Sequence, residues 1–143
     1  MRRFFLAFFT LFALAASALA TDNRQLVTMP APAQAALREE MLDFMSALSQ
    51  IIASLGEGKP SEAADAAEAK LGMGAMGRHR GNPMDAMPGR FMPPDMHAMG
   101  RNLHFAASDF AKVARAGDTV KALAALQPVT ATCVACHMSY RIR

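Results

Sequence analysis

The sequence predicts an all-α protein: a four-helix bundle with a long loop, rich in Met, Gly and Pro, between its second and third helices. Three observations support this fold class. Apolar residues recur at intervals of three and four, which is the period of one face of an α-helix. Glycine or proline stands at the ends of these stretches, and the sequence shows no convincing strand alternation. Four amphipathic helices of this kind bury their apolar faces together as a bundle.

The first 20 residues predict a signal peptide. Two arginines precede an apolar run, and Ala18-Leu19-Ala20 offers a small-x-small cleavage site. The run is short for a membrane span, which needs about 20 apolar residues. We therefore expect export to remove residues 1–20, and residues 21–143 to form one domain with no membrane span. A retained N-terminal anchor is the alternative.

The mature chain would be almost neutral. The full chain has 15 basic and 12 acidic residues, and cleavage removes two arginines, so the net charge falls from +3 to +1 (13 − 12). Such a balance gives little electrostatic support for nucleic-acid binding, and no nucleic-acid partner is expected. The periplasm is oxidising, so a disulfide is one possible use of the two cysteines.

The first two helices follow from apolar spacing and from the residues at their ends. The apolar stripe over residues 37–55 advances in steps of three and four and stops at Gly56. Pro60 then starts a short, alanine-rich second helix, because proline is favourable in the first turn. This second helix is expected to end at Gly72.

The second half of the chain predicts a loop and two more helices. Residues 72–94 are rich in Gly, Pro and Met and have no helical period, which is typical of a loop. A third helix is predicted from about Asp95 to Gly117. Asp118 can cap a fourth helix, which Pro128 should bend or locally break.

The only two cysteines of the chain, Cys133 and Cys136, stand directly before His137. On a helix, steps of three and four residues place these three side chains on one face. C-x-x-C-H is the attachment signature of c-type haem. The thiols form thioethers with the two vinyl groups, and the adjacent imidazole reaches the iron as an axial ligand. We therefore expect one covalent haem c, with His137 as the metal ligand.

Other uses of this motif have less support. A thioredoxin-like C-x-x-C should lie near a βαβ pattern, which the sequence does not show. A disulfide between two helical residues has poor geometry and gives the adjacent histidine no role. A zinc site needs further ligands, and the remaining histidines are only His79, His97 and His104. The sequence shows no catalytic triad, paired carboxylates or phosphate loop, so an enzyme is not expected.

The segment CVACHMSYR resembles the C-x-x-C-H-x-x-[YF]-R ending of the class II c-type cytochromes, the family of the cytochromes c prime. REEMLDFM, over residues 38–45, is similar to the first-helix segment of that family, and GEGKPSEAADAAEAKL to the start of its second helix. The resemblance implies a periplasmic electron carrier that cycles between Fe(III) and Fe(II). It also allows a homodimer, and it implies redox partner proteins whose identity the sequence does not give.

The resemblance further implies roles on both faces of the iron. Arg141 would lie beside the proximal imidazole, and Arg38 near a haem propionate, with a solvated helix start as the alternative for Arg38. If Arg38 sets the register, Leu42 takes the distal position and leaves the iron open to small gases such as NO and CO. Met41 and Met45 flank Leu42, and either thioether could instead bind as the sixth ligand. Electron transfer and gas binding are both open on this basis.

Seven methionines crowd the loop and the start of the third helix. Thioethers are soft ligands that suit Cu(I), so a copper-binding module is a further alternative. Packing in the third helix and flexible apolar filling of the loop is the other interpretation. The class II family is not usually this rich in methionine here. The residues concerned are Met73, Met76, Met84, Met87, Met92, Met96 and Met99, with His79 and His97 among them.

Overall fold

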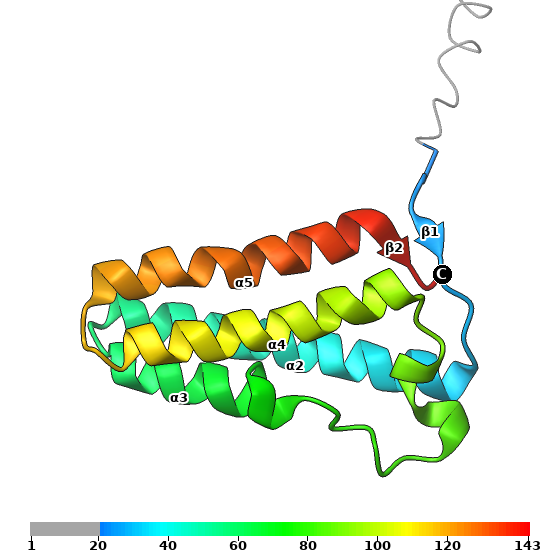
Figure 1. Cartoon of the computed structure of the whole chain (residues 1–143), viewed down its shortest axis with the longest axis horizontal. Helices are drawn as coiled ribbons and strands as arrows, with labels where there is room; N and C mark the ends of the chain where they lie inside the picture. The colour runs from blue at the N-terminus through cyan, green and yellow to red at the C-terminus, as the bar shows by residue number, and fades with distance from the viewer. Residues whose placement is uncertain (1–20) are drawn as a thin grey trace, which may run out of the picture.

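The computed structural model describes residues 21–143, so the predicted signal peptide lies outside the described part. Four long helices run side by side along the molecule (Figure 1). They are α2 (Ala31–Gly56), α3 (Pro60–Lys70), α4 (Pro94–Ala114) and α5 (Thr119–Ser139). The closest packing is between helices that are consecutive in the chain. The predicted four-helix bundle is confirmed.

The helix ends follow the local chemistry of the sequence. α2 begins at Ala31, before the apolar stripe, because a proline in its first turn needs no hydrogen-bonded N–H there. Gly58 after α2 has φ 71° and Gly117 after α4 has φ 86°, which glycine adopts without steric cost. Asp118 is the N-cap of α5, and its carboxylate accepts a hydrogen bond from the Lys121 N–H at 3.0 Å.

Pro128 lies inside α5, and the helix continues through it from Thr119 to Ser139. Proline has no N–H, so the carbonyl of Ala124 loses its usual helical partner. Both Ala124 and Pro128 are exposed, so water can bond to that carbonyl. The sequence predicted a bend or a local break at Pro128, and the local break is absent.

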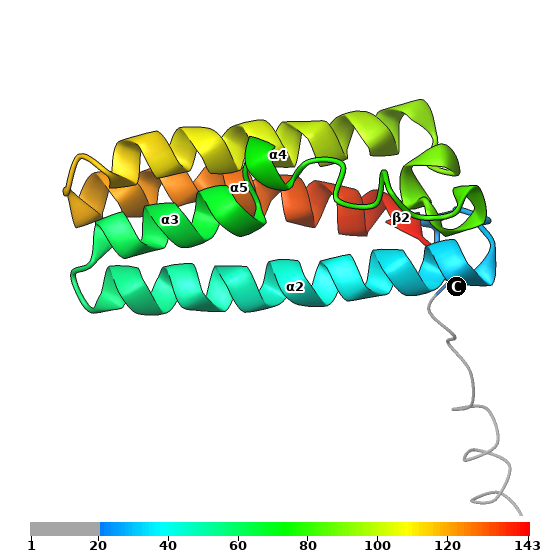
Figure 2. The ribbon, with the colours of Figure 1, turned by 90° about the horizontal axis from the view of Figure 1, so that it is seen from below.

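The segment between α3 and α4 contains three single-turn 3₁₀ helices: η1 (Met73–Ala75), η2 (Met84–Ala86) and η3 (Pro88–Arg90). Figure 2 shows this segment leading from the end of α3 to the start of α4. An ion pair holds it to α2, because Arg78 Nη1 donates to Asp43 Oδ2 at 2.8 Å.

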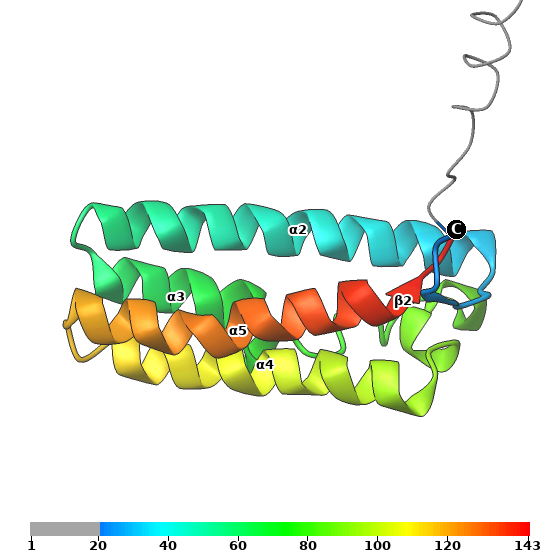
Figure 3. The same cartoon turned by 90° about the horizontal axis from the view of Figure 1, so that it is seen from above.

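Two short strands, which the sequence prediction did not include, join the two ends of the domain. β1 (Gln25–Leu26) pairs in parallel with β2 (Tyr140–Arg141). The Val27 N–H extends the pairing by donating to the Arg141 carbonyl at 2.8 Å. Residues before α2 are thereby tied to residues after α5, and the C-terminus lies beside the start of α2 (Figure 3).

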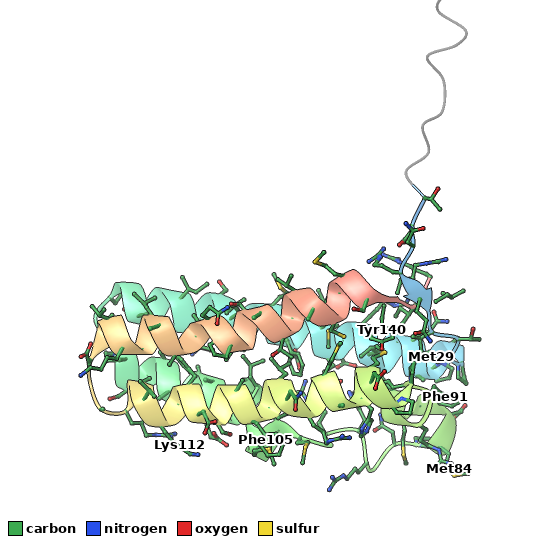
Figure 4. All side chains as sticks on the ribbon, turned by 45° about the horizontal axis from the view of Figure 1, so that its top comes forward. Met29, Met84, Phe91, Phe105, Lys112 and Tyr140 are labelled. Atoms are coloured by element: carbon green, nitrogen blue, oxygen red, sulfur yellow. The ribbon has the colours of Figure 1, made fainter. Side chains whose placement is uncertain are left out.

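Apolar side chains form two clusters. The main core joins the four helices around Ile51, Phe110 and Val129, the largest fully buried side chains. The end cluster lies where β1 and β2 meet the bundle, and Figure 4 shows its members Met29, Phe91 and Tyr140 at that end. Its buried members are Val27, Met29, Ala33, Leu37 and Met96, and its half-buried members are Met41, Phe91, Met92, Cys136, Tyr140 and Ile142.

Candidate functional site

The two cysteines lie one turn apart near the C-terminal end of α5, and both are half-buried free thiols. Cys133 packs against the main core, whereas Cys136 packs against the end cluster. Burial raises the pKa of both thiols, and the nearby Cys133 raises the pKa of Cys136 further. The side chain of His137, the next residue, is exposed. The motif therefore lies where the two clusters meet.

The side of α5 that faces α2 is poorly covered. α5 packs closely along α4, whereas α2 and α5 are neighbours that make few contacts (Figure 3). Among the described helices, α5 alone is long and apolar enough to cross a membrane, a test that core helices of bundles also pass. Only 17% of its most apolar stretch is buried. An apolar helix with so little cover can accept an apolar group against its α2 side.

The three distal candidates on α2 lie in different environments. Met41 is half-buried and packs in the end cluster together with Cys136. Leu42 is 72% exposed, because successive helical residues turn by about 100° and this turn carries it to the outer side of α2. Met45 lies one turn after Met41 on the same flank but is 66% exposed. Met41, and not Leu42, therefore packs against the same cluster as Cys136.

A family comparison decides what kind of protein carries this arrangement. Residues 33–141 match the family model described as Cytochrome C'. The chain belongs to the cytochrome c' family. It is therefore a haem-binding c-type cytochrome, and the family implies covalent attachment of haem c. Comparison with curated proteins and with solved structures gives no match.

The residues of the cytochrome fit a haem on the α2 side of α5. Cys133 and Cys136 are the only cysteines of the chain, and neither is engaged in a disulfide. The main core and the end cluster offer apolar walls on either side of them. Met41 offers a thioether from the opposite helix, and His137 follows the second thiol directly. Two thiols and an adjacent imidazole are the groups that covalent attachment of c-type haem uses.

The two arginines implicated by the family resemblance lie in different settings in the cytochrome. Arg38 is exposed on α2, three residues before Met41 and so on a neighbouring flank. Arg141 is half-buried in β2, with its Nε 3.5 Å from Oδ2 of Asp22. Arg141 therefore lies just past the attachment motif, while the propionate role of Arg38 stays a prediction.

The other three histidines of the cytochrome each have a protein partner. His104 is buried, and its Nδ1–H donates to the Leu71 carbonyl at 2.8 Å. His79 Nε2 lies 3.5 Å from Glu40 Oε2, and its Nδ1 is 3.3 Å from the side-chain amide of Asn82. The third, His97, is hydrogen-bonded through its Nδ1 to the guanidinium of Arg101 on the same helix. These contacts tie each of the three imidazoles to a neighbouring group of the bundle.

The methionine-rich segment divides into two groups. Met92 and Met96 pack in the end cluster, so the segment contributes directly to the apolar surroundings of Cys136. Met84 is 65% exposed, and Met73 is half-buried at the start of the loop. Packing accounts for the first group. The copper role stays a prediction, which metal analysis of the purified cytochrome can check.

Sequence reasoning missed two residues that the fold brings to the attachment motif. Arg24 Nη1 donates to the His137 carbonyl at 3.4 Å, across 113 residues of sequence. Asp22 holds Arg24 through a bidentate ion pair whose shorter distance is 2.7 Å. The sequence contained no local signal for this contact, because Arg24 and His137 lie 113 residues apart.

Proposed function

We propose that this cytochrome is a periplasmic electron carrier in which Cys133 and Cys136 hold the haem, His137 is the proximal ligand and Met41 is the sixth ligand. The observation that carries the proposal is that Met41 and Cys136 both pack against the end cluster, while Leu42 is 72% exposed on the far side of α2. Export is supported by residues 1–20, in which two arginines precede an apolar run and a small-x-small cleavage site.

When bound, the haem supplies an iron that cycles between Fe(III) and Fe(II) by outer-sphere electron transfer. The chain contributes attachment, ligation and exclusion of water. The two thiols would fix the macrocycle to α5, and the imidazole of His137 would then lie within reach of the metal. The thioether of Met41 is a soft, neutral ligand, which favours the reduced state relative to a charged ligand. The end cluster keeps that ligand among apolar side chains.

The number of protein ligands at the iron distinguishes electron transfer from gas binding, because a second protein ligand occupies the position that a gas would take. Gas binding needs a distal residue that cannot coordinate, which is the role the family resemblance offered to Leu42. The outward position of Leu42 gives that role no support, because its side chain lies away from Cys136. Met45 is the second choice for the sixth ligand, since it shares the flank of Met41 but is 66% exposed.

The experiment is an optical and carbon-monoxide titration of the holoprotein and of Met41→Leu. Leucine has nearly the volume of methionine, so the packing cost is expected below about 1.5 kcal/mol, but leucine cannot coordinate. We expect the wild type to be low-spin and unresponsive to carbon monoxide, and Met41→Leu to be high-spin and to bind the gas. Met45→Leu is the matched control and should behave like the wild type.

Two results would count against the proposal. A wild-type spectrum that is already high-spin and responsive to carbon monoxide would favour the gas-binding hypothesis. If Met45→Leu becomes high-spin and Met41→Leu does not, Met45 is the sixth ligand, and the electron-transfer function still holds.

A further inference from the structure

The residues before α2 form an arm across the attachment end of α5. We define the N-terminal strap as residues 22–29. Its backbone pairs with β2, and the Val27 N–H donates to the Arg141 carbonyl at 2.8 Å. Val27 and Met29 are 3% and 5% exposed and pack in the end cluster that contains Cys136. Figure 4 shows Met29 near Tyr140, the residue that follows α5. The strap is thus anchored beside the attachment motif.

Three charged side chains meet where the strap crosses the end of α5. The carboxylate of Asp22 accepts hydrogen bonds from the backbone N–H of Arg24 at 3.1 Å, from its Nε at 2.9 Å and from its Nη2 at 2.7 Å. Oδ2 of Asp22 also lies 3.5 Å from Nε of Arg141, a buried atom that has no hydrogen-bond partner within residues 21–143. One carboxylate therefore faces two guanidinium groups.

Arg24 makes the direct contact with the haem-binding turn. Its Nη1 donates to the carbonyl of His137 at 3.4 Å. That carbonyl belongs to the last turn of α5, where carbonyl groups lack helical partners, and a basic side chain at this position also interacts favourably with the helix dipole. The carbonyl before it is satisfied differently, since Cys136 O accepts from the Tyr140 N–H. Arg24 therefore holds the backbone of the residue that carries the proximal imidazole.

We propose that the N-terminal strap positions His137 and sets the charge next to it, with Arg24 as the positioning residue and Asp22 as its counter-charge. The inference rests on the proposed haem function and extends it to the proximal side. Arg24 and Arg141 bring two positive charges to the end of α5, and Asp22 cancels one of them. Positive charge near an iron centre stabilises the reduced form, because Fe(II) carries one positive charge fewer than Fe(III).

The test is a redox titration of four holoprotein variants whose covalent haem content is measured first. Asp22→Asn leaves both guanidinium groups uncompensated, and the reduction equilibrium should move toward Fe(II) by roughly threefold to tenfold at low salt. Arg24→Gln removes one positive charge and should move the equilibrium toward Fe(III). Shifts of opposite sign in the reduction equilibrium would show an effect of charge. A strap that merely loosens would shift the reduction equilibrium of both variants in the same direction.

Two further variants complete the design. Asp109→Asn makes the same charge change in an exposed pair with Lys112, at the far end of the bundle from Tyr140 (Figure 4), and should leave the equilibrium unchanged. Arg24→Lys keeps the charge but loses the planar fork, so the equilibrium should stay near that of the wild type while the low-spin electron paramagnetic resonance signal changes.

The outcomes distinguish the two proposals. If Asp22→Asn and Arg24→Gln carry low-spin haem and match Asp109→Asn in their reduction equilibrium, the strap proposal is overturned and the proposed function stands. If the wild type itself attaches no haem, the proposed function falls first. Shifts of the same sign in Asp22→Asn and Arg24→Gln would also overturn the charge role.

Discussion

Shortening Val27 to alanine should destabilise the cytochrome by loosening the N-terminal strap. Val27 is 3% exposed and lies in the end cluster. The substitution removes two carbon atoms from this buried side chain, which at about 0.8 kcal/mol each gives about 1.6 kcal/mol. The cavity left behind adds to this transfer cost. We therefore expect the free energy of unfolding to fall by about 2 kcal/mol.

The next residue provides a matched control. Thr28→Ala also removes two heavy atoms, but Thr28 is exposed on the opposite face of the strap. A surface change of this kind usually stays within about 0.5 kcal/mol. Any difference between the two variants then reports burial in the end cluster and not the loss of atoms as such.

The assay is thermal unfolding of the holoprotein followed by circular dichroism. For a domain of this size, about 2 kcal/mol corresponds to a fall in Tm of roughly 8 °C. Amide exchange should show the same effect locally, because the Val27 N–H is bonded to the Arg141 carbonyl. Equal Tm values for Val27→Ala and Thr28→Ala would refute the reasoning, and would mean that the end cluster does not hold the strap.

Three further predictions concern the thiols, the main core and a helix cap. In protein made without haem, Cys133 and Cys136 should alkylate more slowly at pH 8 than a free cysteine, because burial raises their pKa and lowers the thiolate fraction; equal rates would contradict this. Phe110→Ala should lower the free energy of unfolding by about 3–5 kcal/mol, and Phe105→Ala by much less, because these α4 side chains are 1% and 52% exposed; chemical unfolding curves decide between them. Asp118→Ala should lower Tm at pH 7, because the carboxylate accepts the Lys121 N–H and this bond depresses its pKa. The stabilisation is present above the usual carboxyl pKa and is lost as pH falls through the depressed one, so a Tm difference that stays constant down to acid pH would argue against it.

The bundle could be predicted because its helices are signalled locally. Apolar spacing and end residues fix where each helix lies, and Gly117 with Asp118 marks the turn into α5 within about one residue. The apolar stripe alone does not show where α2 begins, since residues 31–36 are mostly small and give no strong apolar signal. The β1–β2 pair was missed because strands of two residues have no period to detect and their partners lie far apart in the sequence.

The proximal side of the site was more accessible to sequence reasoning than the distal side. C-x-x-C-H is a contiguous motif, so its three residues could be named without a structure. The choice among Met41, Leu42 and Met45 depends on how α2 is rotated against α5. Adjacent positions differ by about 100° in direction, and an alignment offset of one residue is enough to exchange a buried side chain for an exposed one. Only packing against the end cluster distinguishes them.

The position of the motif in the last turns of α5 explains what the N-terminal strap contributes. His137 lies in the last turn of α5, and a last helix turn has carbonyl groups without helical partners, so it tends to fray. A ligand on a fraying turn would not hold an iron in a fixed geometry. The strap supplies backbone pairing to β2, the side chain of Arg24 to the His137 carbonyl, and two buried side chains to the cluster around Cys136. These contacts hold the last turn of α5 on three sides of its end: at its backbone, at the His137 carbonyl and at the apolar cluster.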